Sequence, residues 1–124
     1  MMFLYVALGG AIGASFRHFV SMRMLSFYGS AFPYGTLTVN ILGSFLMGVI
    51  ITYLVKTLPH SNELRMFLVV GVLGGFTTFS AFALDFISLM EDRGLALAAF
   101  YIVLSVIGSI LAILFGVFLT RAFL

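Results

Sequence analysis

Four long apolar runs, joined by short polar connections, constrain the fold of this chain more than any other feature. They cover residues 2–22, 36–55, 66–90 and 95–120. A helix that crosses the hydrocarbon core of a bilayer needs about 20 mostly apolar residues, so each run can cross once. Only 8% of the 124 residues are charged, against about 25% in soluble domains. The sequence therefore predicts an integral membrane protein in contact with lipid.

The runs are predicted to be helices, because backbone in lipid must satisfy its own hydrogen bonds. A membrane barrel would need strands of alternating polarity, which the runs lack. The first run has no basic residues before it, so we interpret it as a retained helix and not as a signal peptide. The expected fold class is all-α, with four transmembrane helices in a single domain over residues 1–124.

Lysines and arginines near the ends of the runs give no clear orientation in the membrane. The side of the termini would carry Lys56, Arg65 and Arg121, and the other side Arg17, Arg23 and Arg93. Positive charge normally sets orientation, and here the two sides are equal. Either an unseen rule selects one side or both orientations insert. The second possibility favours an antiparallel, dual-topology homodimer with its two-fold axis in the membrane plane.

The stretch GGFTTFSAF, residues 74–82, is unusual inside an apolar run. Paired glycines and β-branched threonines make a poor helix interior, so we predict a break near mid-membrane. Broken helices expose carbonyls that bind cations and N–H groups that bind anions. Phe79 and Phe82 lie three apart on one face. Such rings usually contact lipid or core, but their positive edges could also hold an anion.

Polar residues in the other runs allow two interpretations each. Asn40 either joins helices by hydrogen bonds or faces a pore as a donor. Arg17 either extends to the interface or attracts anions in a vestibule. Tyr101, Ser105 and Ser109, spaced by four, form a hydroxyl ladder on one helix face, which either bonds its own backbone or lines a polar path.

Several function classes find no support in the sequence. Cysteine is absent, and His18 and His60 lie far apart, so no metal-ligand spacing is present. No nucleophile–base pair or paired carboxylates indicate an enzyme. No nucleic-acid partner is expected.

Four motifs together resemble the Fluc (CrcB) family of fluoride channels: GASFRH in the first run, TVNILGSF in the second, GGFTTFSAF in the third and Y-x-x-x-S-x-x-x-S in the fourth. The resemblance covers essentially the whole chain. It implies a dual-topology homodimer with two antiparallel fluoride pores. Such channels would export fluoride passively through the cell membrane, the inner membrane where there are two, and so lower its concentration in the cytoplasm.

The resemblance also implies roles for individual residues. The residues that it places along the fluoride pore are Asn40, Thr78, Phe79, Ser80, Phe82, Tyr101, Ser105 and Ser109. It places Arg17 at the vestibule. A structural Na⁺ at the centre of the dimer would be held by the backbone carbonyls of Gly74 and Thr77 from both subunits.

Two rival functions stay open. A proton-coupled exporter of the small multidrug type needs a central carboxylate. Asp85, six residues beyond Phe79, is the one acidic residue inside a run, although it also lies close enough to the end of the run to be interfacial. The second rival is a membrane assembly subunit that transports nothing.

Overall fold

The computed structural model describes all residues 1–124, and the chain is helical nearly throughout. Its elements are α1 (Met2–Tyr28), α2 (Tyr34–Thr57), α3 (Asn62–Arg65), the π-helix η1 (Met66–Leu73), α4 (Gly74–Phe76), α5 (Phe79–Arg93) and α6 (Leu95–Phe123). Taken together, α3 to α5 form one crossing, so four spans are long and apolar enough to cross a membrane. The prediction of an all-helical chain with four potential membrane spans is confirmed.

The helices extend past the apolar runs that predicted them. α1 continues to Tyr28, and α6 continues to Phe123. Hydropathy marks the part of a helix that suits hydrocarbon, whereas the helix itself ends where the backbone must turn. Two of these turns have glycines at positive φ, Gly29 at 74° after α1 and Gly94 at 101° between α5 and α6.

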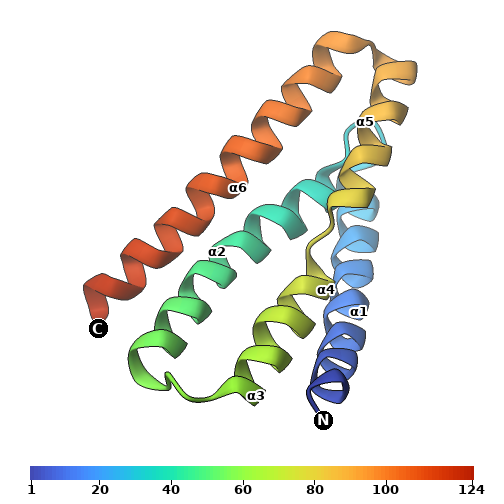
Figure 1. The fold of residues 1–124 in the computed structure, drawn as a ribbon. Coiled ribbons are helices and arrows are strands. Elements are labelled where there is room, and N and C mark those ends of the chain that lie inside the picture. The colour runs from blue at the N-terminus through green and yellow to red at the C-terminus, as the bar shows by residue number, and fades with distance from the viewer.

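The spans form two pairs, and the two members of each pair run in the same direction (Figure 1). α6 runs beside α2, and α1 packs against η1 and α4. Both termini and the α2–α3 connection lie at one end of the molecule, and the α1–α2 and α5–α6 connections lie at the other. An even number of crossings produces this arrangement.

Glycines allow both pairs to pack backbone against backbone. A Cβ atom on Gly48 would overlap the carbonyl of Ile113, and one on Gly116 would overlap the carbonyl of Phe45. Gly13 makes an equally close approach to η1. Small residues commonly allow membrane helices to approach each other this closely.

The third span is irregular on both sides of Gly74. η1 is a π-helix, a rare conformation that the sequence pattern did not predict. Thr77 (φ −85°, ψ 157°) and Thr78 (φ −152°, ψ 121°) are extended between α4 and α5. β-branched residues accept extended backbone readily, so both threonines suit this place.

Only 16 of the 124 residues are buried, which leaves most apolar side chains facing outwards, as in a chain surrounded by lipid or by further protein. The main cluster of buried apolar residues joins α5 to α6 and consists of Phe82, Leu89, Ala98 and Tyr101.

Candidate functional site

The side chain of Asn40 on α2 makes two hydrogen bonds to the extended segment of the third span. Its Nδ2 donates to the carbonyl of Thr78 at 2.9 Å, and its Oδ1 accepts from the N–H of Thr78 at 2.8 Å. The extended backbone leaves both Thr78 groups without helical partners, and one amide satisfies both. Since an amide nitrogen carries two N–H groups, Asn40 keeps one further donor.

The start of α5 is capped by its own side chains. Thr78 is the N-cap residue, and its Oγ1 accepts from the N–H of Ala81 at 3.1 Å. The exposed Ser80 places its Oγ 3.4 Å from the same Oγ1, and either hydroxyl can donate. Polar groups therefore gather where the third span resumes.

Arg17 on α1 is half-buried, and its Nε donates to the carbonyl of Gly75 at 2.9 Å. A cation at the C-terminal end of a helix is stabilised by the exposed carbonyls there, and α4 ends at Phe76. The sequence alone did not indicate this partner. The nearby carbonyl of Thr77 accepts no hydrogen bond, and Gly74 is exposed.

A cleft of about 410 Å³, here called the inner cleft, lies between α2, the start of α5 and α6. It brings together seven of the predicted site residues: Asn40, Thr77, Thr78, Phe79, Phe82, Ser105 and Ser109. Its other lining residues are Gly43, Ser44, Met47, Val106, Ile110 and Ile113. No charged side chain lines it. Arg17, Gly74, Ser80 and Tyr101 lie outside this lining.

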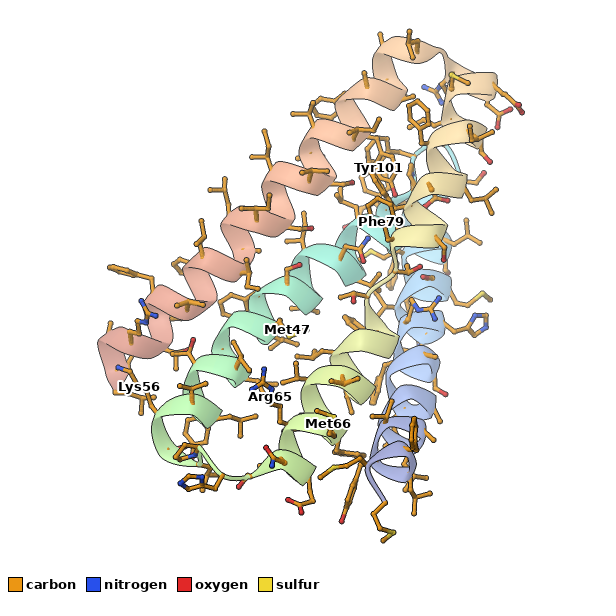
Figure 2. The ribbon with its side chains drawn as sticks, in the orientation of Figure 1. Met47, Lys56, Arg65, Met66, Phe79 and Tyr101 are labelled. Atoms are coloured by element: carbon orange, nitrogen blue, oxygen red, sulfur yellow. The ribbon has the colours of Figure 1, made fainter.

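The two phenyl rings of the inner cleft differ in burial. Their centroids are 5.4 Å apart in an edge-on arrangement, with planes inclined by 61°. Phe82 is 8% exposed, whereas Phe79 is 78% exposed. Figure 2 shows Phe79 and Tyr101 close together where α5 approaches α6. Phe82 is therefore held by its own chain, and Phe79 projects outwards from it.

The hydroxyl ladder follows α6 along the inner cleft. Tyr101 is fully buried, Ser105 is 5% exposed and Ser109 is half-buried. The Ser105 Oγ is the only buried side-chain nitrogen or oxygen in the chain with no hydrogen-bond partner. Leaving such a group unsatisfied costs about 1–3 kcal/mol. Ser105 is thus free to bond whatever enters the cleft.

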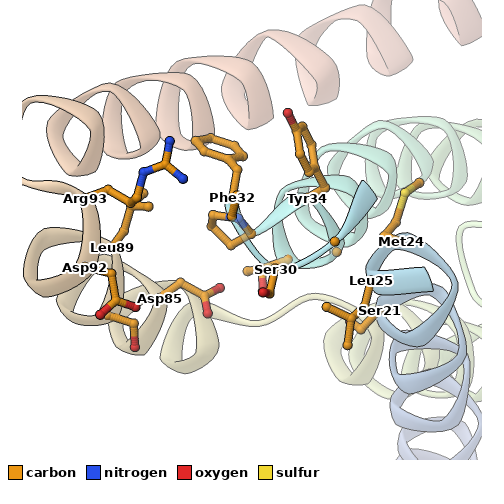
Figure 3. A pocket seen from close by; sticks show the side chains of 16 residues that line it. Ser21, Met24, Leu25, Ser30, Phe32, Tyr34, Asp85, Leu89, Asp92 and Arg93 are labelled. Carbon is orange, nitrogen blue, oxygen red and sulfur yellow. The ribbon is translucent and has the colours of Figure 1, made fainter. Parts of the chain in front are cut away.

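A second cleft, here called the outer cleft, has a volume of about 470 Å³. It lies between the end of α1, the α1–α2 connection and the last turns of α5, and its charged lining residues are Asp85, Asp92 and Arg93 (Figure 3). Thr36 of α2, four residues before Asn40, also lines it.

Tyr101 separates the two clefts. Its hydroxyl donates to Oδ2 of Asp85 in the outer cleft at 3.1 Å. Its ring packs on Phe82 of the inner cleft, with centroids 5.2 Å apart, and meets Phe32 edge-on at 5.5 Å. Sequence reasoning missed the link to Asp85. The available signal was the glycine turn at Gly94, which makes α5 and α6 a hairpin and so brings their facing residues together.

Known proteins resemble this chain over most of its length. A family model described as "CrcB-like protein, Camphor Resistance (CrcB)" matches residues 4–117. A protein of Agrobacterium fabrum named "Fluoride-specific ion channel FluC" is 52% identical over 116 residues, which are 94% of this chain and 93% of that protein. Relatives of the same name in Mesorhizobium japonicum and Chelativorans sp. are 49% and 48% identical, over 96% and 98% of this chain and 95% and 97% of theirs.

Proposed function

This chain belongs to the CrcB-like protein family, and from that premise we propose that it is a passive, fluoride-selective ion channel. It would let fluoride leave the cytoplasm through the cell membrane, the inner membrane where there are two, and so lower the internal concentration. The names of its relatives support the substrate, and the four apolar spans support a multi-pass membrane location. Conduction through a channel requires no enzymatic step.

The unpartnered hydroxyl of Ser105 carries the proposal. Fluoride is a small, strongly hydrated anion, so a pore must replace its water with close hydrogen-bond donors. The inner cleft offers the hydroxyls of Ser105 and Ser109 and the remaining N–H of Asn40. Thr78, Ser80 and Tyr101 would extend this set of donors along the path.

The rings of Phe79 and Phe82 would contribute selectivity. The edge of a phenyl ring is weakly positive, so it attracts an anion less strongly than a fixed cation does. Conduction needs binding that is favourable enough for entry and weak enough for exit. A narrow passage between ring edges would also exclude the larger chloride ion.

We propose that the working unit is an antiparallel homodimer with two pores. The equal division of basic residues between the two sides allows both orientations. Phe79 is 78% exposed on the single chain, and a second copy placed against it would complete the wall of the pore. A two-fold axis would repeat that contact and so create a second pore.

A structural Na⁺ fits the interruption of the third span, which we place at mid-membrane. The Thr77 carbonyl accepts no hydrogen bond within the chain, and carbonyl oxygen is a suitable ligand for a hard cation. Gly74 and Thr77 of both subunits would hold the ion and so join the two copies. The donors that Arg17 has left would add positive potential at the vestibule.

Fluoride efflux from liposomes tests the function. The purified chain is reconstituted with potassium fluoride inside, and a fluoride electrode records efflux before and after valinomycin is added. A passive channel should release fluoride only once potassium can follow, and it should release no chloride. Phe82→Leu should reduce the rate by about tenfold or more, given the usual effect of displaced positioning groups, while the matched control Leu84→Ala, an exposed residue of α5, should not.

Two outcomes would contradict the proposal. Efflux that needs a proton gradient and no valinomycin would favour the coupled exporter. No efflux from well-folded protein would favour the assembly subunit.

A further inference from the structure

We propose that Asp85 controls how tightly the pore holds fluoride, by competing with the ion for the one proton of the Tyr101 hydroxyl. The inference rests on the proposed channel function and adds a positioning residue to it. Asp85 lies in the outer cleft and lines no part of the inner cleft, so it acts on the ion through Tyr101.

The hydroxyl of Tyr101 can donate a hydrogen bond to Asp85 or to fluoride, but not to both at once. A tyrosine hydroxyl has a single O–H to donate. In the structure it points to Oδ2 of Asp85, at 3.1 Å. In that state Tyr101 presents only lone pairs towards the hydroxyl ladder, and lone pairs repel an anion. The hydroxyl must rotate away from Asp85 before it can donate to fluoride.

The bond to Asp85 is weak enough to be exchanged. A hydroxyl that donates to a carboxylate usually lies at about 2.5–2.7 Å from it, and this one is longer. Tyr101 is fully buried, so its ring is fixed and only the proton turns. The O–H bond itself stays intact, and one hydrogen bond replaces another.

The other groups around Asp85 do not compete for this proton. The titratable and charged side chains that line the same cleft are Asp92 and Arg93 on α5 and Tyr34 on α2. The α1 residues there, Ser21, Met24 and Leu25, carry no charge. None of these side chains is hydrogen-bonded to Asp85, whose one bond comes from Tyr101.

Exchange of this kind would help an ion to leave. Fluoride beside Tyr101 can move on to Ser105, one helical turn away, whose hydroxyl has no other partner. As the ion moves, the Tyr101 hydroxyl turns back and donates to Asp85 again. Tyr101 then has no donor left for an ion that returns. Tyr101 then binds fluoride loosely, as conduction requires.

The concentration dependence of fluoride current tests the inference. Asp85→Asn replaces a carboxylate by a weaker acceptor of the same shape, so fluoride should win the proton more often. The fluoride concentration that gives half-maximal current should fall about fivefold. In a Tyr101→Phe background, which has no proton to compete for, Asp85→Asn should cause no shift. The control Asp92→Asn removes a charge from the same cleft without touching Tyr101, and it should behave as wild type.

Three results would overturn the inference while the wild-type chain still conducts fluoride. They are no shift in Asp85→Asn, an equal shift in the Tyr101→Phe background, and an equal shift in Asp92→Asn. The last two would mean that the charge of the outer cleft acts directly on the ion. A wild-type chain that passes no fluoride would instead refute the channel function itself.

Discussion

The inner and outer clefts are similar in size and opposite in chemistry. The outer cleft, of about 470 Å³, is lined by Asp85, Asp92 and Arg93, whereas the inner cleft, of about 410 Å³, has no charged side chain at all. Its polar groups are hydroxyls and one amide, set among phenyl and aliphatic side chains. The comparison indicates that fixed charge lines the cleft beside the α1–α2 connection, whereas only neutral donors line the inner cleft.

Physical chemistry gives a reason for that separation. A fixed charge about 4 Å from an ion interacts with it by about 4 kcal/mol where the effective dielectric constant is near 20. A fixed cation with an interaction of that size would hold an anion too tightly for rapid exit, and a fixed anion would keep it out. Neutral donors and ring edges interact less strongly, so an interior without charge favours movement over storage.

The largest expected effect comes from placing a carboxylate in the inner cleft. Ser109→Asp should reduce fluoride efflux from liposomes by about 100-fold, because the new charge repels the anion by roughly 3 kcal/mol. Ser88→Asp is the matched control, since Ser88 lines the outer cleft where carboxylates already lie. It should change efflux by less than about twofold. Equal losses in both variants would remove the functional contrast between the clefts.

The next effect is on stability and follows loss of the two hydrogen bonds from Asn40 to the Thr78 backbone, a type of contact that the outer cleft lacks. Asn40→Leu leaves the N–H and the carbonyl of Thr78 without partners, at a cost of about 1–3 kcal/mol each. The melting temperature of the purified protein in detergent should fall by several degrees. Asn62→Leu is the control, because Asn62 is exposed at the start of α3 and its side chain makes no hydrogen bond. An unchanged melting temperature in Asn40→Leu would mean that the fold around the inner cleft does not depend on these two hydrogen bonds.

The smallest effect is expected for Ser105→Ala. Without fluoride, the variant should be as stable as the wild type or up to about 1 kcal/mol more stable, since it loses an unsatisfied buried hydroxyl. Added sodium fluoride should then stabilise it less than it stabilises the wild type, because the stabilisation by a bound ligand, RT ln(1 + [L]/Kd), falls when the affinity falls. Thermal unfolding with and without fluoride measures both changes. Ser88→Ala in the outer cleft should retain the full response, and a full response in Ser105→Ala would exclude Ser105 as a fluoride donor.

Hydropathy was sufficient to predict the four spans, because lipid permits few alternatives to a helix. The run 95–120 contains no charged residue, and α6 covers all of it. Spacing also placed Ser105 and Ser109 on one face of α6, where both line the inner cleft. Local rules of this kind depend only on neighbours along the chain.

Contacts between distant segments could not be predicted in the same way. Arg17 and Gly75 are 58 residues apart, and Asn40 and Thr78 are 38 apart. Each pair depends on how two helices are rotated about their axes, which hydropathy does not specify. The π-helix η1 could not be predicted either. Its residues Met66–Leu73 are all apolar or glycine, and this pattern does not distinguish a π-helix from an α-helix.

The outward position of Phe79 has a consequence for how this chain would work in a membrane. One ring of the proposed passage belongs to the surface of the single chain, so an isolated copy would have a pore open to acyl chains along one side. The number of working pores would then depend on how many copies are paired as dimers. At low surface density, the number of working passages would rise with the square of the amount of protein, and a cell would need enough copies before any fluoride could escape.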